Sequence, residues 1–267
     1  MHACALVTLT IQLTCARATP SLEIATTTSV VNSGLLEAIL PAFADARVRV
    51  HAAGSGRSLA MLEDRTVALV ISHAPNAERE FLARHPEWRY QKLATNRFIL
   101  VGPDADPAGV RLAANTKDAF ARIAASQAVF ISRGDGSGTH ERETALWKLS
   151  GVVPPTERLI ISGGSMAVTL QQADSQLAYT LTDDATWHQL RGQLDGLAEV
   201  FGDEPVLLNS YAVIYRNDQR ASALAEWLTS GPGRTAIADY RIGGRPVFTV
   251  WPQGCFGAMP EAPLCGT

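Results

Sequence analysis

The chain carries little charge and no surplus of basic residues. Charged residues make up 18% of its 267 positions, and 23 Lys and Arg stand against 26 Asp and Glu, so the formal net charge is −3. Proteins that bind nucleic acid or an acidic membrane surface usually carry clusters of Lys and Arg, and the sequence contains no such cluster. We therefore expect neither partner.

Long apolar runs are also missing. The apolar segment near the N-terminus, residues 3–13, is shorter than the roughly 20 residues that span a bilayer as a helix. It is followed by Ala16-Arg17-Ala18, which fits the A-x-A rule for signal-peptide cleavage. We predict that residues 1–18 are a signal peptide and that the mature, exported chain begins near Thr19. A buried N-terminal strand is the alternative interpretation of the same residues.

Cysteine is scarce, with four in the whole chain. Cys4 and Cys15 would leave with the signal peptide, whereas Cys255 and Cys265 remain in a tail rich in proline and glycine. Two nearby cysteines in an exported chain predict one disulfide that closes a small loop, with two free thiols as the alternative. No histidine lies near this pair, so we expect no zinc site, and we predict neither another metal nor a cofactor.

The most informative stretch that is present runs from Phe130 to Trp147, FISRGDGSGTHERETALW. It consists of the end of an apolar strand, a glycine-rich loop that contains Arg133, and the start of an amphipathic helix. Glycine permits positive φ and a close approach of the backbone to a ligand. Ser137 and Thr139 are suitable residues to cap the helix, and a helix N-terminus beside an arginine favours an anion. An ordinary strand-to-helix turn is the alternative.

Several catalytic and nucleotide-binding motifs are absent. The loop matches neither GxxxxGK[ST] nor GxGxxG, so it is no P-loop and no dinucleotide-binding turn. An enzyme built on Ser137 and His140 is an alternative of a different class. The sequence contains no GxSxG elbow, and residues this close on one turn do not easily form a base–nucleophile pair. We therefore predict no catalytic residues and expect a binding protein; His140 is expected to cap or pack.

Apolar strands alternate with helical patterns along the chain. The expected strands are 21–25, 47–52, 67–72, 97–101, 159–162, 178–182 and 205–215, and the expected helices include 57–64, 78–84, 116–125, 167–175, 186–191, 222–228 and 233–239. This alternation predicts an α/β fold with mostly parallel sheets flanked by helices. The hydroxyl-rich and glycine-rich motifs TTTS, GSG, SRGDGSGT and GGS all follow strands. Ligands of such sheets bind beyond the carboxyl ends of the strands.

Two segments, 97–103 and 205–215, are suited to cross between two lobes. We predict that residues 19–101 plus 212–267 form lobe 1 and that residues 102–211 form lobe 2. TTTS and GSG would then lie on lobe 1, and SRGDGSGT and GGS on lobe 2. A ligand would be held in the cleft between the lobes.

These motifs resemble those of the periplasmic solute-binding proteins of tungstate ABC transporters, which have the type II periplasmic binding fold. The matching segments are IATTTSVVNSGLLEAILPAF, AAGSGRSLAMLE, HAPNAEREF, NRFILVGPDADPAGV, FISRGDGSGTHERETALWKLSG, AYTLTDDATW and LLNSYAVI. They span roughly Leu22 to Leu228 in the family order. The resemblance implies a two-lobed α/β fold, a periplasmic location, capture of tungstate or molybdate in the interlobe cleft, and delivery to an ABC transporter permease. We expect a monomer.

The resemblance and the loop pattern together give a set of ligand-binding residues. These are Thr27, Thr28, Ser29, Ser55, Arg133, Ser137, Thr139 and Ser165. A tetrahedral dianion such as tungstate needs only hydrogen-bond donors, which hydroxyls, backbone amides and a guanidinium supply. Phosphate is partly protonated and also needs an acceptor. Asp135 is expected to orient Arg133, and its alternative role as that acceptor keeps a phosphate-binding protein open. A sulfate-binding protein is a further alternative of the same class. A ligand-sensing domain is a third alternative.

The sequence departs from the family pattern at three places near these motifs. LTDRGT is replaced by LTDDAT, so Asp184 stands where relatives carry arginine, and the GQGM-like segment reads GGSM at 163–166. The strand 67–72 also lacks the acidic residue that relatives usually have there. If the missing arginine helps the lobes to close or attracts the ligand, affinity or specificity will differ.

Overall fold

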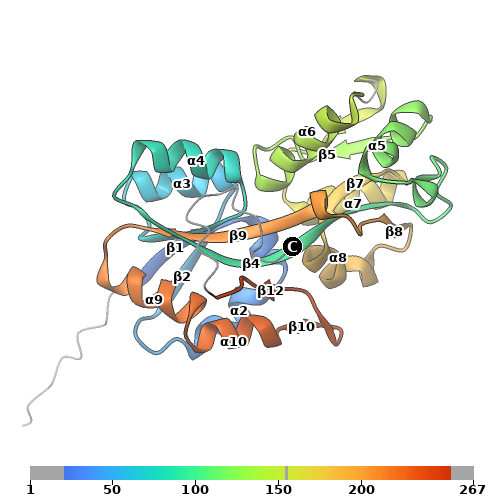
Figure 1. Cartoon of the computed structure of the whole chain (residues 1–267). Coiled ribbons are helices and arrows are strands. Elements are labelled where there is room, and N and C mark those ends of the chain that lie inside the picture. Colours follow the sequence, from blue (N-terminus) through green and yellow to red (C-terminus); the bar gives the residue numbers. More distant parts are fainter. Residues whose placement is uncertain (1–20, 154–155, 254–267) are drawn as a thin grey trace, which may run out of the picture.

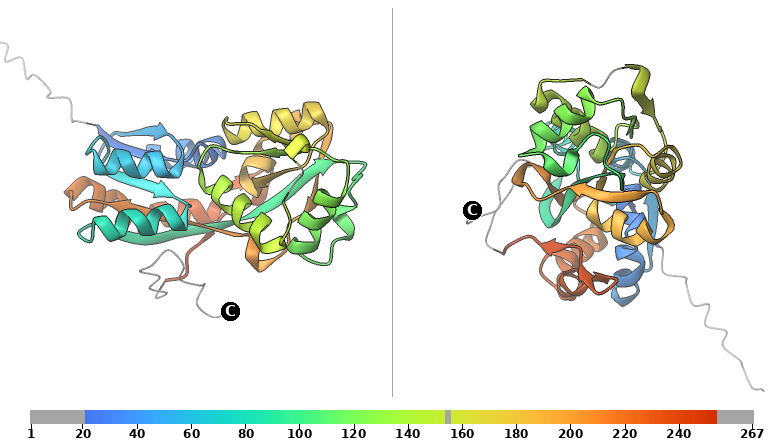
Figure 2. Two further views of the ribbon diagram at one scale, coloured as in Figure 1. Left: turned by 90° about the horizontal axis from the view of Figure 1, so that it is seen from above. Right: turned by 90° about the vertical axis from the view of Figure 1, so that its right-hand side faces the viewer.

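The computed structural model describes residues 21–153 and 156–253. The predicted signal peptide, residues 1–18, and the predicted Cys255–Cys265 disulfide lie outside the described residues. Within the described ranges no helix has both the length and the apolar character to cross a membrane. Two bodies lie side by side and are joined by the long strands β4 (Arg89–Pro103) and β9 (Leu208–Tyr215) (Figures 1 and 2).

The first lobe is built on a sheet with strand order β12-β4-β9-β3-β1-β2. Its further strands are β1 (Leu22–Thr26), β2 (Val48–Ala52), β3 (Leu69–Ser72) and β12 (Thr249–Val250). Figure 1 shows α3 (Ser55–Glu63) and α4 (Pro75–Arg84) on one face of this sheet, with α2 (Leu35–Ile39), α9 (Gln219–Thr229) and α10 (Pro232–Asp239) on the other. The short helix α1 (Thr28–Asn32) follows β1, and β10 (Arg241–Ile242) pairs with β11 (Arg245–Pro246).

Side chains of this sheet alternate between two separate cores. Ile24 of β1 and Val213 of β9 belong to the core beneath α2, α9 and α10. Ala25 and Ile214, one residue further along each strand, belong to the core beneath α3, where Leu59 is fully buried. Because both faces of the sheet are covered by helices, the central strand β3 is buried at all four positions rather than at every second one.

The second lobe surrounds the other half of β4. Residues 98–103 of β4 pair with β7 (Thr180–Asp183) and β8 (Leu197–Phe201), whereas residues 89–97 pair with β9. A small parallel sheet of β5 (Phe130–Ser132) and β6 (Leu159–Ile161) lies next to β7. The helices of this lobe are α5 (Thr116–Ala125), α6 (Gly138–Ser150), α7 (Met166–Gln176) and α8 (Asp184–Leu190). Short 3-10 turns lie at Leu40–Ala42, Val110–Leu112, Thr156–Arg158, Arg191–Gln193 and Pro205–Leu207.

The α/β architecture agrees with the prediction, but the expected dominance of parallel pairing is wrong. β1 is parallel to β2 and β3, and β5 is parallel to β6. β9 runs antiparallel to both β3 and β4, and β4 runs antiparallel to β7, β8 and β12. The reason is topological: β4 carries the chain into the second lobe and β9 brings it back, so these two neighbours point in opposite directions.

Most expected elements are present with shifted ends, and three expectations need correction. β4 starts at Arg89, eight residues before the predicted 97, because pairing with β9 fixes a segment that is too polar to read as a strand. β9 starts at Leu208, because Pro205 lacks an amide donor and begins a 3-10 turn instead. Strand β8 was not expected at all. The lobe boundaries at 101/102 and 211/212 stay predictions.

Candidate functional site

The loop between β5 and α6 has the conformation that its glycines predict. Gly134 and Gly136 have φ of 58° and 70°, in the left-handed region that favours glycine. Ser137 is the N-cap of α6, and its hydroxyl accepts a hydrogen bond from the amide of His140 at 3.4 Å. Thr139 lies inside the helix, so the cap is Ser137 alone. The loop therefore turns the chain sharply and leaves the N-terminus of α6 beside Arg133.

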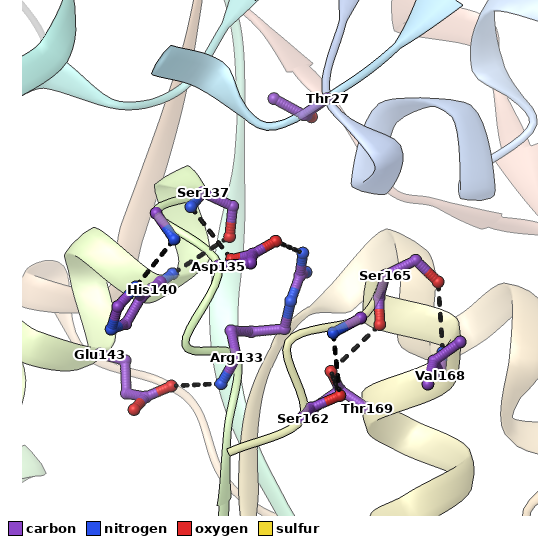
Figure 3. Close-up of polar contacts among 12 residues, drawn as sticks. Thr27, Arg133, Asp135, Ser137, His140, Glu143, Ser162, Ser165, Val168 and Thr169 are labelled. Atoms are coloured by element: carbon purple, nitrogen blue, oxygen red, sulfur yellow. Dashed lines mark hydrogen bonds and ion pairs between the residues drawn. The ribbon is translucent and has the colours of Figure 1, made fainter. Parts of the chain in front are cut away.

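Arg133 is almost fully buried, with 1% of its surface exposed. Its Nη2 forms an ion pair with Asp135 Oδ2, and the other carboxylate oxygen accepts the amide of Ser137 at 3.0 Å (Figure 3). Nε and Nη1 of Arg133 have no hydrogen-bond partner among the described residues. A buried guanidinium with unpartnered donors is unfavourable unless a ligand or bound water supplies acceptors.

Two buried hydroxyls share this property. Ser55, the first residue of α3, and Thr139 on α6 are both fully buried, and neither hydroxyl has a partner in the described part of the chain. The loops that carry them approach closely: a Cβ added to Gly54 would lie 3.9 Å from Ser137 Cα. Donors from both lobes, buried and unpaired, therefore gather around the N-terminus of α6.

The remaining predicted residues lie at two further helix starts. Thr27 is the N-cap of α1, where its hydroxyl accepts the amide of Val30 at 3.4 Å, and Ser165 is the N-cap of α7. α1 contacts α7. Figure 3 shows Thr27 on one side and Arg133, Ser137 and Ser165 on the other.

The TTTS run is partly helical rather than a loop. Thr28, half-buried, and Ser29, buried, belong to α1, which begins at Thr28. The hydroxyl of Thr26 donates to the carbonyl of Ile71 at 3.1 Å and so serves the sheet. Seven of the eight predicted ligand residues thus lie in the first turn of α1, α3, α6 or α7, or cap it, and the eighth, Arg133, lies in the loop between β5 and α6. Their contact with a ligand stays a prediction.

The two histidines near these loops have structural contacts. His140 Nδ1 accepts the amide of Gly136 at 2.9 Å, so the ring holds the glycine loop, and the described hydrogen bonds include none from this ring to the hydroxyl of Ser137. His73 lies between Phe98 and Tyr211, and its Nδ1 pairs with Asn209 Oδ1 at 3.0 Å. Burial lowers the pKa of His73 to about 4, so the ring is neutral at pH 7.

Sequence reasoning missed Glu143, which lies directly behind Arg133. Its Oε2 accepts the backbone amide of Arg133 at 3.0 Å, and the residue is 3% exposed. Burial raises the pKa of Glu143 to about 7. The signal was available, because Glu143 shares an i, i+3, i+4 helix face with the buried Leu146 and Trp147. A carboxylate on such a face needs a specific donor.

The raised pKa of Glu143 predicts a pH effect on stability. The ordinary value is near 4.5, so between about pH 4.5 and 7 the folded chain keeps a proton that the unfolded chain releases. The free energy of unfolding contributed by this group therefore falls as the pH rises through that window and is constant above it. The lowered pKa of His73 has the opposite effect: it makes the free energy of unfolding rise with pH below pH 6.5. The effect of Glu143 is therefore best measured as a difference between wild type and Glu143→Gln.

We expect the stability of the wild type, relative to Glu143→Gln, to fall by up to about 2 kcal/mol between pH 5 and pH 7.5. Urea unfolding at several pH values measures this difference. The same substitution at Glu80, which is exposed on α4, controls for the change in charge. A difference that does not vary with pH contradicts the prediction.

Asp184, at the position where the resemblance has arginine, lies next to the fully buried Asp183. Asp183 accepts hydrogen bonds from Thr186 and from Asn96 of β4. Asp184 Oδ1 accepts the amide of Arg97 at 3.4 Å. Burial first, and the neighbouring Asp183 second, raise the pKa of Asp184 to about 7. The substitution therefore puts an acidic pair beside the strand that crosses between the lobes.

The fold and these motifs match known proteins. The family model described as "PBP superfamily domain" matches residues 16–232 of this chain. The chain is 34% identical over 244 residues to the tungstate-binding protein TupA of Peptoclostridium acidaminophilum, covering 86% of this chain and 85% of TupA.

Two solved structures are also similar. The tungstate ABC transporter structure from Geobacter sulfurreducens has a TM-score of 0.75 and 34% identity, covering 82% of this chain and 98% of that one. The tungstate-binding protein TupA of Desulfovibrio alaskensis G20 has a TM-score of 0.72 and 33% identity, and the match covers 86% of this chain and 98% of that one.

A match over most of the chain shows that this protein belongs to the PBP superfamily, and the predicted α/β fold of that class is confirmed. Within the superfamily, its family is the one that contains the tungstate-binding proteins TupA. The resemblance inferred from the motifs is therefore confirmed as well.

Proposed function

We propose that this protein captures a tetrahedral oxyanion, tungstate or molybdate, between its two lobes for uptake by an ABC transporter. The observation that carries the proposal is the buried guanidinium of Arg133, whose Nε and Nη1 lack partners among the described residues beside the equally unpaired hydroxyls of Ser55 and Thr139. The family relationship supports the same ligand, because relatives are named tungstate-binding proteins.

The chemistry of the donors fits an unprotonated dianion. Four oxygens of tungstate accept hydrogen bonds and donate none, and charge-assisted bonds from Arg133 are roughly twice as strong as neutral ones. The N-termini of α6 and α7 add partial positive charge. Both oxygens of Asp135 already accept hydrogen bonds, from Arg133 and from the amide of Ser137. This supports an orienting role for Asp135 rather than acceptance of a phosphate proton.

Closure of the lobes is part of the proposal. Ser55 belongs to the first lobe and Arg133 to the second, so an anion that contacts both links the lobes. Exclusion of water from the closed cleft strengthens each polar contact. The protein would then act in the periplasm as a monomer, without catalysis, and deliver the anion to a membrane permease.

Calorimetric titration of the mature protein with tungstate, molybdate, sulfate and phosphate tests this function. Tungstate and molybdate have the same charge and nearly the same size, so we expect both to bind far more tightly than the other two anions. A preference for phosphate that is lost in Asp135→Asn would instead make Asp135 an acceptor. If none of the four anions binds, the proposal is wrong, and a sensor of another ligand or an enzyme takes its place.

A further inference from the structure

Glu141 forms a hydrogen bond between the two lobes. It lies in the first turn of α6, in the second lobe, and its Oε1 accepts the backbone amide of Asn76 at 3.0 Å. Asn76 is the second residue of α4, in the first lobe. Burial raises the pKa of Glu141, and hydrogen bonds from the amides of Asn76 and Ala77 oppose that rise. The contact thus joins a side chain of one lobe to a helix N-terminus of the other.

α4 has no cap of its own at the amides that Glu141 contacts. Its N-cap position is Ala74, which has no side-chain acceptor, and Pro75 has no amide hydrogen. The buried Glu78 accepts the amide of Ala74 at 3.0 Å, but Ala74 is the N-cap residue, so this bond does not satisfy the amides of Asn76 and Ala77. N-cap side chains usually bond to the second or third helical amide. Glu141 supplies that bond from the other lobe.

The same turn of α6 carries the proposed anion donors. Ser137 caps the helix, and the buried Thr139 lies between it and Glu141 in the sequence. Gly138 packs against the first lobe at His73, since a Cβ on this glycine would lie 2.6 Å from the His73 carbonyl oxygen. One helical turn therefore holds both the proposed anion contacts and the contacts between lobes.

We propose that Glu141 is a latch that stabilises the closed, anion-loaded conformation by capping α4 across the cleft. This inference rests on the proposed function, and Glu141 acts as a positioning residue that does not touch the anion. When the lobes separate, the carboxylate and the amides of Asn76 and Ala77 return to water, so only the closed state gains the bond. A negative charge at a helix N-terminus makes the bond charge-assisted.

Titration with sodium tungstate of four proteins tests the latch: wild type, Glu141→Ala, Glu141→Gln and the control Glu80→Gln. We expect Glu141→Ala to bind about tenfold more weakly, Glu141→Gln to lie between it and wild type, and Glu80→Gln to bind like wild type. Loss of a negative charge near the cleft would by itself strengthen the binding of an anion, so the expected weakening has the opposite sign from simple electrostatics. Ligand-free unfolding temperatures should be equal for all four proteins.

The outcomes separate the latch from the function on which it rests. Unchanged tungstate binding in Glu141→Ala and Glu141→Gln overturns the latch and leaves the proposed function intact. A lowered unfolding temperature of the ligand-free Glu141 variants also overturns it, because Glu141 would then brace the chain in every state. If wild type binds none of the four anions, the proposed function has failed, and the latch fails with it.

Discussion

Replacing Arg133 by alanine is expected to weaken tungstate binding by about thirtyfold to several thousandfold, because truncating one member of a buried, charge-assisted set of hydrogen bonds typically costs about 2–5 kcal/mol. Arg133 is 1% exposed, and its Nε and Nη1 have no other partner among the described residues. Calorimetric titration with tungstate measures the loss. Arg133→Lys should recover little of it, since an ammonium lacks the planar fork and the second nitrogen.

The matched control is Arg111→Ala in the same lobe. It removes the same charge and also breaks an Arg–Asp pair, Arg111 Nη2 to Asp104 Oδ1 at 3.1 Å, but this pair is exposed. We expect wild-type affinity for this control. Thermal unfolding provides a second measurement: the same tungstate concentration should raise the unfolding temperature of wild type and of Arg111→Ala by similar amounts, and raise that of Arg133→Ala much less. An equal rise in all three proteins would contradict the role of Arg133.

The second large effect is expected from a single methyl group at Gly138. A Cβ there would lie 2.6 Å from the His73 carbonyl oxygen and 2.8 Å from two atoms of its ring. A backbone atom cannot rotate away, so Gly138→Ala must push α6 away from the turn between β3 and α4. Overpacking of this kind costs about 1–3 kcal/mol, and here it falls on the closed arrangement of the lobes. We expect tungstate affinity to fall about five- to hundredfold.

Gly56→Ala is the control for this substitution. Gly56 lies inside α3, with no atom within 4 Å of an added Cβ, so alanine should favour the helix and leave binding unchanged. Titration with tungstate and thermal unfolding of both ligand-free variants complete the comparison. Equal affinities of Gly138→Ala and Gly56→Ala would show that the close approach of α6 to His73 has no part in ligand binding.

Local sequence patterns were sufficient for much of the fold. The helix predicted at 116–125 coincides with α5, and the glycine loop predicted after 130 has the left-handed φ angles at Gly134 and Gly136 that only glycine adopts readily. Such features depend on residues close in sequence. The direction of β9 relative to β3 and the early start of β4 at Arg89 depend on partners more than a hundred residues away, and no local pattern specifies them.

The candidate site shows the same division. Hydroxyls and glycines placed after strands, together with the family resemblance, gave Ser55, Arg133 and Ser165 as expected ligand residues, because helix starts supply donors wherever they occur; their contact with a ligand stays a prediction. Glu141 has no such signal, since its role depends on the uncapped start of α4, 65 residues away in the chain. Glu143 did carry a signal, a charge on an apolar helix face, but its partner was fixed only by folding.

The sequence by itself determined the type of each site element: strand, turn, capped helix, and an arginine with its neighbouring aspartate. These are set by interactions within a few residues, such as Ser137 with the amide of His140 and Asp135 with the amide of Ser137. The tertiary structure alone decided which donors were buried without partners and which donors of the two lobes came close together. Burial and close approach, as between Gly54 and Ser137 or between Gly138 and His73, arise only when two distant segments pack together.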